Sequence, residues 1–235
     1  IIGLMSFLPS ANQHIQYAQN FNQIQKQYQM FGQQAPPPNI LSQIWQGVLG
    51  MMFTMVLFIT PLVTMRLFTE ERRTGTFELL ATSPISSWAI VLGKFFAGFS
   101  LYLFSILITG VFASVILFWG NPDFGPVLSG YFGVILMGGL AMAVGTWIST
   151  LTDNQVIAAV LTFFVMLMLL FMGYLTNFIP IEWLRVTLEY ISFEAHISDF
   201  FQGVIDTKHI VYFVSLTFFV LLMTQQSIES KRWRA

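Results

Sequence analysis

The sequence has no cysteine and very little charge. Asp, Glu, Lys and Arg make up 9% of its 235 residues, against about a quarter in an ordinary soluble domain. Without cysteine, the chain has no disulfide, no thiol nucleophile and no thiolate ligand for a metal. The few charged residues cannot cover a water-facing surface of this size. A net charge of −1 gives no general attraction to nucleic acid, so we expect no nucleic-acid partner.

Charge is absent altogether from five long stretches. No Asp, Glu, Lys or Arg occurs within residues 27–65, 95–122, 124–152, 154–181 and 209–228. A helix needs about 20 apolar residues to cross a bilayer, and each stretch is long enough. Because backbone groups in lipid must form hydrogen bonds within their own segment, the spans are expected to be helices. The predicted spans cover residues 45–65, 95–119, 129–150, 156–177 and 209–227.

Lys and Arg are distributed unevenly between the two sides of these spans. One side carries Arg66, Arg72, Arg73, Lys94, Lys231, Arg232 and Arg234. The other side carries only Lys26, Arg185 and Lys208. By the positive-inside rule, residues 66–94 and the C-terminus face the cytoplasm, and residues 10–44 and 178–208 lie outside.

The chain opens on an apolar stretch, IIGLMSFLPS, that does not begin with Met. We expect residues 1–9 to be the outer end of a first transmembrane helix that is mostly missing from this chain. The alternative is a short flexible terminus. With the first helix counted, the protein has six helices, and residues 45–235 form its transmembrane domain.

Residues 12–34 are rich in Gln and Asn, and their apolar residues recur at helical spacing. These are Tyr17, Phe21, Ile24, Tyr28 and Phe31. The pattern predicts an amphipathic helix within the outer segment 10–44. Its apolar face either packs on the outside of its own protein or binds an external partner or cargo.

Small residues recur four positions apart in the third predicted span, in the stretch GGLAMAVG. The pairs are Gly139 with Ala143 and Ala141 with Gly145. Such pairs let helices approach closely in lipid. We interpret them as helix-packing residues within the chain, the alternative being a contact between subunits.

Residues 178–208 are too polar to span a membrane, yet Trp183, Leu184, Leu188 and Ile191 fall at helical spacing. The pattern predicts one or two short helices at the outer interface. Glu194, His196 and Asp199 follow as an outer polar cluster. A zinc protease would need His-Glu-x-x-His, which is absent, so no metal site is expected.

The middle of each span lacks ionisable residues, and this argues against transport coupled to protons or ions. The chain also lacks the phosphate loop G-x-x-x-x-G-K-[ST]. If ATP drives this protein, a separate subunit therefore binds it.

The segment RLFTEERRTGTFELLATSPISSWAIVLGK, residues 66–94, gathers seven charged residues between two apolar runs. Gly75 predicts a break and residues 76–82 a short cytoplasmic helix. Ser83 followed by Pro84 matches an N-cap and the first position of the next helix.

This short helix is expected to carry apolar residues into water. Phe77, Leu79 and Leu80 lie on it, and we expect them to fill a groove on a partner. Arg73 and Glu78 would make contacts at the rim of that groove. The alternative is an ordinary positively charged loop.

Two stretches carry a resemblance to a known family. EERRTGTFELLATSPISSWAIVLGKFFAG resembles the segment after the second helix of ABC type-2 transporter permeases, especially the gliding-motility and nitrous-oxide-cluster branch. FEAHISDFFQGVIDTKHIVYFVSLT is similar to the last outer loop and final helix of that branch. The resemblance covers roughly residues 45–230. The chain departs from the family by lacking the first cytoplasmic segment and most of the first helix, and the insert 10–44 has no close counterpart.

In the family, the first stretch forms the coupling helix, which docks on the ATP-binding subunit. The resemblance therefore implies a set of coupling residues. They are Glu71, Arg73, Gly75, Thr76, Phe77, Glu78, Leu79, Leu80, Ser83 and Pro84.

The resemblance implies an all-α, polytopic integral membrane protein: a six-helix ABC type-2 (type V exporter-like) permease in the inner membrane of a prokaryote. It is expected to pair with a second permease copy or paralogue, and with two ATP-binding subunits. ATP and Mg would be bound there, leaving this chain without cofactor or catalytic residue. Its uncharged interior fits lipids, glycans, peptides or hydrophobic small molecules. The alternatives are a non-transporting membrane scaffold and an intramembrane enzyme that uses Glu194 and His196.

Overall fold

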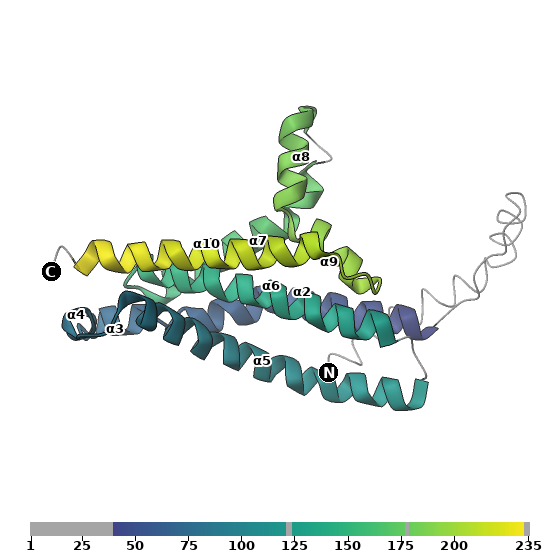
Figure 1. Cartoon of the computed structure of the whole chain (residues 1–235), viewed down its shortest axis with the longest axis horizontal. Helices are drawn as coiled ribbons and strands as arrows, with labels where there is room; N and C mark the ends of the chain where they lie inside the picture. The colour runs from purple at the N-terminus through teal and green to yellow at the C-terminus, as the bar shows by residue number, and fades with distance from the viewer. Residues whose placement is uncertain (1–39, 121–123, 177–178, 233–235) are drawn as a thin grey trace, which may run out of the picture.

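The computed structural model describes residues 40–120, 124–176 and 179–232, and every regular element in these ranges is a helix (Figure 1). The helices are α2 (Ile40–Thr64), α3 (Thr69–Arg73), α4 (Phe77–Thr82), α5 (Ser87–Gly120), α6 (Phe124–Leu151), α7 (Gln155–Leu175), α8 (Glu182–Ile191), α9 (Phe193–Phe201) and α10 (Thr207–Arg232). The predicted all-helical class is confirmed. The helix expected within residues 12–34 and the helix end expected at residues 1–9 lie outside the described residues.

Within the described residues, five segments are long and apolar enough to cross a membrane. They are Gly47–Arg73, Ser87–Val111, Phe124–Leu151, Gln155–Leu175 and Thr207–Ser230. These agree with the five spans predicted from the uncharged stretches, and the chain is a polytopic membrane protein. The segment between the last two spans contains α8 and α9, so it forms two short helices.

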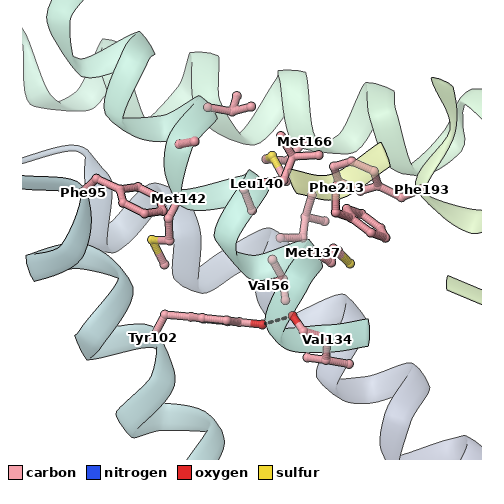
Figure 2. Packing of buried hydrophobic residues seen from close by; sticks show 14 of the residues in the cluster. Val56, Phe95, Tyr102, Val134, Met137, Leu140, Met142, Met166, Phe193 and Phe213 are labelled. Atoms are coloured by element: carbon pink, nitrogen blue, oxygen red, sulfur yellow. Dashed lines mark hydrogen bonds between the residues drawn. The ribbon is translucent and has the colours of Figure 1, made fainter. Parts of the chain in front are cut away.

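Helix α6 lies at the centre of the bundle, where it packs against α2, α5, α7, α9 and α10. Small residues allow these approaches. A Cβ atom added at Gly138 would overlap the ring of Tyr102, and one at Gly145 would overlap the side chain of Thr64. The Tyr102 hydroxyl donates a hydrogen bond of 2.7 Å to the carbonyl of Val134, which fixes α5 against α6 (Figure 2).

The predicted packing residues of α6 lie in this centre. Ala141 and Ala143 are fully buried. An added Cβ at Gly139 would make an ordinary contact, 3.6 Å from Cε2 of Phe99. The tightest approaches in the stretch GGLAMAVG are therefore at its first and last glycines, where α5 and α2 cross α6.

The outward faces of the peripheral helices are apolar. Leu107 on α5 is 70% exposed, and Phe164 on α7 is 62% exposed. Such side chains suit contact with lipid acyl chains, because lipid is as apolar as they are. The long helices run side by side, with α4 and the end of α10 at the same end of the bundle, whereas α8 stands across them in the half of the molecule away from α4 (Figure 1).

Candidate functional site

The charged segment after α2 folds into two short helices. In α3, Glu70 and Glu71 occupy the first turn and Arg72 and Arg73 the last. This order places negative charge at the positive end of the helix dipole and positive charge at its negative end. Gly75 follows with φ of 73°, a left-handed conformation that glycine adopts without steric cost. The chain then turns into α4, as the sequence predicts.

The prediction that Ser83 caps the helix following it is wrong. Ser83 instead ends α4: its backbone is extended, and its hydroxyl donates to the carbonyl of Leu80 at 2.7 Å. The extended backbone is expected for a residue that precedes proline, here Pro84. Helix α5 begins three residues after Pro84, at Ser87, and the hydroxyl of Ser86 accepts a hydrogen bond of 3.2 Å from the amide of Ala89.

Two ionic contacts fasten α3 to the bundle. The Arg72 Nε atom lies 2.6 Å from Oδ1 of Asp153 in the turn between α6 and α7, and its Nη1 donates to the carbonyl of Thr150 at 2.7 Å. Glu71 forms an ion pair with Lys94 of α5. Through these contacts α3 is joined to α5 and to the turn at the end of α6.

The three apolar residues of α4, all predicted to fill a groove on a partner, differ in their exposure in the structure. Leu79 is 73% exposed. Phe77 and Leu80 are half-buried and pack against the hydrophobic core of the same chain. Glu78 and Arg73 are exposed as well. Of these three side chains, Leu79 is therefore the one left exposed, while Phe77 and Leu80 hold α4 against the bundle.

The outer polar residues lie on α9, near the end of the bundle away from α4. The carboxylate of Glu194 lies beside Gly173 of α7, where an added Cβ would come within 3.1 Å of Oε2. His196 is 3% exposed; it stacks on Tyr212 of α10 with ring centroids 3.8 Å apart, and its Nδ1 lies 3.2 Å from the Ser192 carbonyl oxygen. Burial lowers the pKa of His196 below its usual value. Glu194 and His196 thus bind different neighbours.

Asp199 has a partner that sequence spacing does not bring near it. Its Oδ2 lies 2.8 Å from Nε2 of His209, at the start of α10. The two residues come together because the chain turns back between α9 and α10. Within the described ranges, no group of three or more His, Asp or Glu side chains is placed to hold a metal ion.

The sequence model of one protein family, described as "ABC-2 family transporter protein", matches residues 4–223. The chain belongs to the ABC-2 transporter family. Neither the curated proteins nor the solved structures gave a match. Members of the family are membrane subunits of transporters and are not themselves catalytic, and they generally work with an ATP-binding subunit. The resemblance that the sequence carries is confirmed at this level, whereas its assignment to the gliding-motility branch stays a prediction.

In this ABC-2 protein, the residues predicted to couple to ATP hydrolysis share the segment from α3 to the start of α5. Their contacts differ. Glu71 pairs with Lys94 inside the chain, whereas Arg73, Gly75, Thr76 and Glu78 are exposed. The ion pair between Arg72 and Asp153 was not predicted from the sequence, because nothing in the spacing of these residues shows that the α6–α7 turn contacts α3. The available signal was the order of the predicted spans, which places the turn after the third span on the same side as residues 66–94.

Proposed function

We propose that this chain is the membrane-spanning subunit of an ATP-driven exporter, and that α4 docks on a separate ATP-binding subunit. The observation that carries the proposal is the exposed Leu79 at the charged end of the bundle. Fully burying a large apolar side chain contributes roughly 1.5–3 kcal/mol, so a leucine held in water on a short helix favours a partner's groove. Glu78 and Arg73 would set the orientation of docking.

The contacts of α3 supply a route from α4 into the membrane. A push on α4 would reach α5 through Glu71 and Lys94. It would reach the end of α6 through Arg72, which contacts Asp153 and Thr150. Closure of the ATP-binding subunits on ATP would then tilt these spans, and their binding free energy would favour one of two transport states.

The proposed assembly has two ATP-binding subunits beneath two permeases, the second permease being another copy or a paralogue. ATP and Mg bind in the partner subunits. The complex lies in the inner membrane of a prokaryote, with the C-terminus in the cytoplasm. Residues 10–44 are then outside, where they are available to an external partner. The substrate class that fits uncharged spans is a lipid, glycan, peptide or hydrophobic small molecule.

The test is to replace Leu79 and measure how much ATP-binding subunit co-purifies with the permease. Leu79→Ala is expected to weaken docking by about tenfold, since about 1.4 kcal/mol corresponds to that factor, and Leu79→Asp more strongly. Leu107→Ala is the matched control, because Leu107 is exposed to a similar degree (70%, against 73% for Leu79) but lies on α5 in the membrane.

Both Leu79 variants should insert normally, and ATP-dependent transport should fall in each in step with the amount of partner that is lost. The proposal fails if Leu79→Asp retains its ATP-binding subunit at wild-type strength and still transports. A wild-type complex that binds the partner but shows no ATP-dependent transport would favour the scaffold alternative.

A further inference from the structure

Helix α8 separates charged from apolar residues around its axis. Its charged residues follow one another at spacings of three and four, which places them in a single exposed stripe: Glu182, Arg185 and Glu189. Its most exposed apolar residues follow the same spacing on a neighbouring face: Trp183 (71%), Val186 (56%) and Tyr190 (61%). Exposing this apolar face to water would be energetically unfavourable, so we expect another apolar surface to contact it.

The position of α8 in the bundle limits which surface can contact its apolar face. Helix α8 packs beside α7 and α9 and stands across the long helices (Figure 1). Helix α7 has 21 residues, a length of about 31 Å, which is close to the thickness of a bilayer's hydrocarbon core. It starts beside the exposed Asp153, at the opposite membrane surface. Because α8 contacts α7, it cannot be far beyond the outer boundary of the core.

A second limit comes from the charged stripe. A charged residue at the centre of a membrane costs at least about 2.5–3.5 kcal/mol, and Glu182, Arg185 and Glu189 are all exposed. Helix α8 therefore cannot lie deep in the core either. The two limits meet at the boundary between the acyl chains and the headgroups.

We infer that α8 binds the lipid surface opposite α4 and lies flat in it, with Trp183, Val186 and Tyr190 in the acyl–headgroup boundary and the charged stripe toward water. Trp and Tyr are enriched at this depth in membrane proteins. One Arg between two Glu gives the stripe no excess positive charge, so it fits zwitterionic rather than anionic headgroups. The inference needs only that the chain spans a membrane and does not rest on the proposed function.

Binding to lipid would also position the neighbouring helix. Ser192 joins α8 directly to α9, and its hydroxyl accepts a hydrogen bond from the amide of Ala195 at 3.4 Å. Phe200 of α9 in turn fills the space beside Gly133 of α6, where an added Cβ would lie 2.8 Å from it. Anchored in the lipid surface, α8 would hold α9 against the centre of the bundle.

The absence of cysteine from the sequence makes a direct test simple. Single cysteines are introduced at adjacent positions on the two faces, Val186→Cys with Arg185→Cys, and Trp183→Cys with Glu182→Cys. The full chain is spin-labelled and reconstituted in phosphatidylcholine vesicles. Accessibility of each label to oxygen, which concentrates in lipid, is compared with its accessibility to a water-soluble nickel chelate. Phe164→Cys on the outward face of α7 gives the value for a label in lipid.

The inference predicts that labels at 186 and 183 resemble the label at 164, with oxygen access at least several-fold above nickel access, while labels at 185 and 182 show the reverse. The second pair gives the answer if a variant of the first pair fails to fold. Equal nickel access on both faces would mean that α8 stands in water, and would overturn the inference. So would labels at 183 and 186 that are shielded from both reagents and broadened by spin–spin contact, which would place a second copy of the chain on this face.

Discussion

Arg72 of α3 and Asp153 of the α6–α7 turn form an ion pair with 2.6 Å between Nε and Oδ1, and the two side chains differ in exposure, at 19% and 65%. The guanidinium also donates to the carbonyl of Thr150, near the end of α6. Arg72 thus holds α3 against the end of α6 and the turn that follows it through two contacts. Of these, the contact with the Asp153 carboxylate is the more exposed to solvent.

Arg72→Ala is expected to destabilise the protein more than Asp153→Asn. Losing a solvated carboxylate should cost at most about 1 kcal/mol. Losing the guanidinium removes the ion pair and also leaves the Thr150 carbonyl without this donor. Thermal unfolding of the purified variants measures the difference, with the exposed neighbour Arg73→Ala as control. Equal effects of the two substitutions would mean that the contact with Thr150 contributes nothing.

Substitutions of the three apolar residues of α4 should differ in their effect on the melting temperature, because the residues differ in burial. Phe77→Ala with Leu80→Ala removes half-buried contacts with the core and is expected to lower the melting temperature, at roughly 1 kcal/mol for each half-buried side chain. Leu79→Ala should leave the melting temperature unchanged. Scanning calorimetry or fluorimetry of both variants decides this. A similar loss of stability in the Leu79 variant would show that Leu79 packs within the chain.

Adjacent glycines on α6 offer a test of helix packing. Gly138→Ala would push a methyl group into the ring of Tyr102, which is 1% exposed and held by its hydrogen bond to Val134, so it cannot move aside. Overpacking of this kind costs about 1–3 kcal/mol. Gly139→Ala places its methyl group at an ordinary 3.6 Å from Phe99 and should be tolerated. Melting temperatures that fall equally in both variants would contradict the packing described for α5 and α6.

The stability of the packing between α9 and α10 should depend on pH through His196. Burial lowers the pKa of His196, with His209 and Lys208 opposing its protonation and Asp199 favouring it. In the unfolded chain His196 has an ordinary pKa of about 6.5, whereas burial lowers that pKa in the folded protein. The unfolded chain therefore binds the proton more readily. As a result, the free energy of unfolding is highest above about pH 6.5 and falls as the pH drops below that value. His196→Phe, which keeps an aromatic ring against Tyr212, should show a smaller loss of melting temperature between about pH 7.5 and about pH 5.5. An unchanged pH dependence in that variant would assign the effect to another group.

The spans and the short helix before α5 could be predicted from the sequence because both follow from local features. Uncharged stretches must become helices in lipid, and Gly75 marks the turn into α4. Ser83 shows the limit of such local rules. Serine before proline fits a helix start, yet Ser83 ends α4 and the next helix starts only at Ser87.

Contacts between distant segments could not be predicted in this way. Nothing local distinguishes Leu79 from Phe77 and Leu80, because exposure depends on which face of α4 meets the other helices. The pairing of Asp199 with His209 likewise depends on how the chain turns back between α9 and α10. Charge and periodicity predict the helices and spans, whereas the partners of each side chain come from packing.

The most direct test of the central claim is photo-crosslinking from position 79. A photoreactive amino acid replaces Leu79 in the full chain, which is co-expressed with its ATP-binding subunit and irradiated in membranes, and position 107 on α5 serves as the control. A covalent adduct with the ATP-binding subunit is expected from position 79 and none from position 107. An intact complex that gives no adduct with that subunit from position 79 would contradict the assignment of α4 as the docking surface.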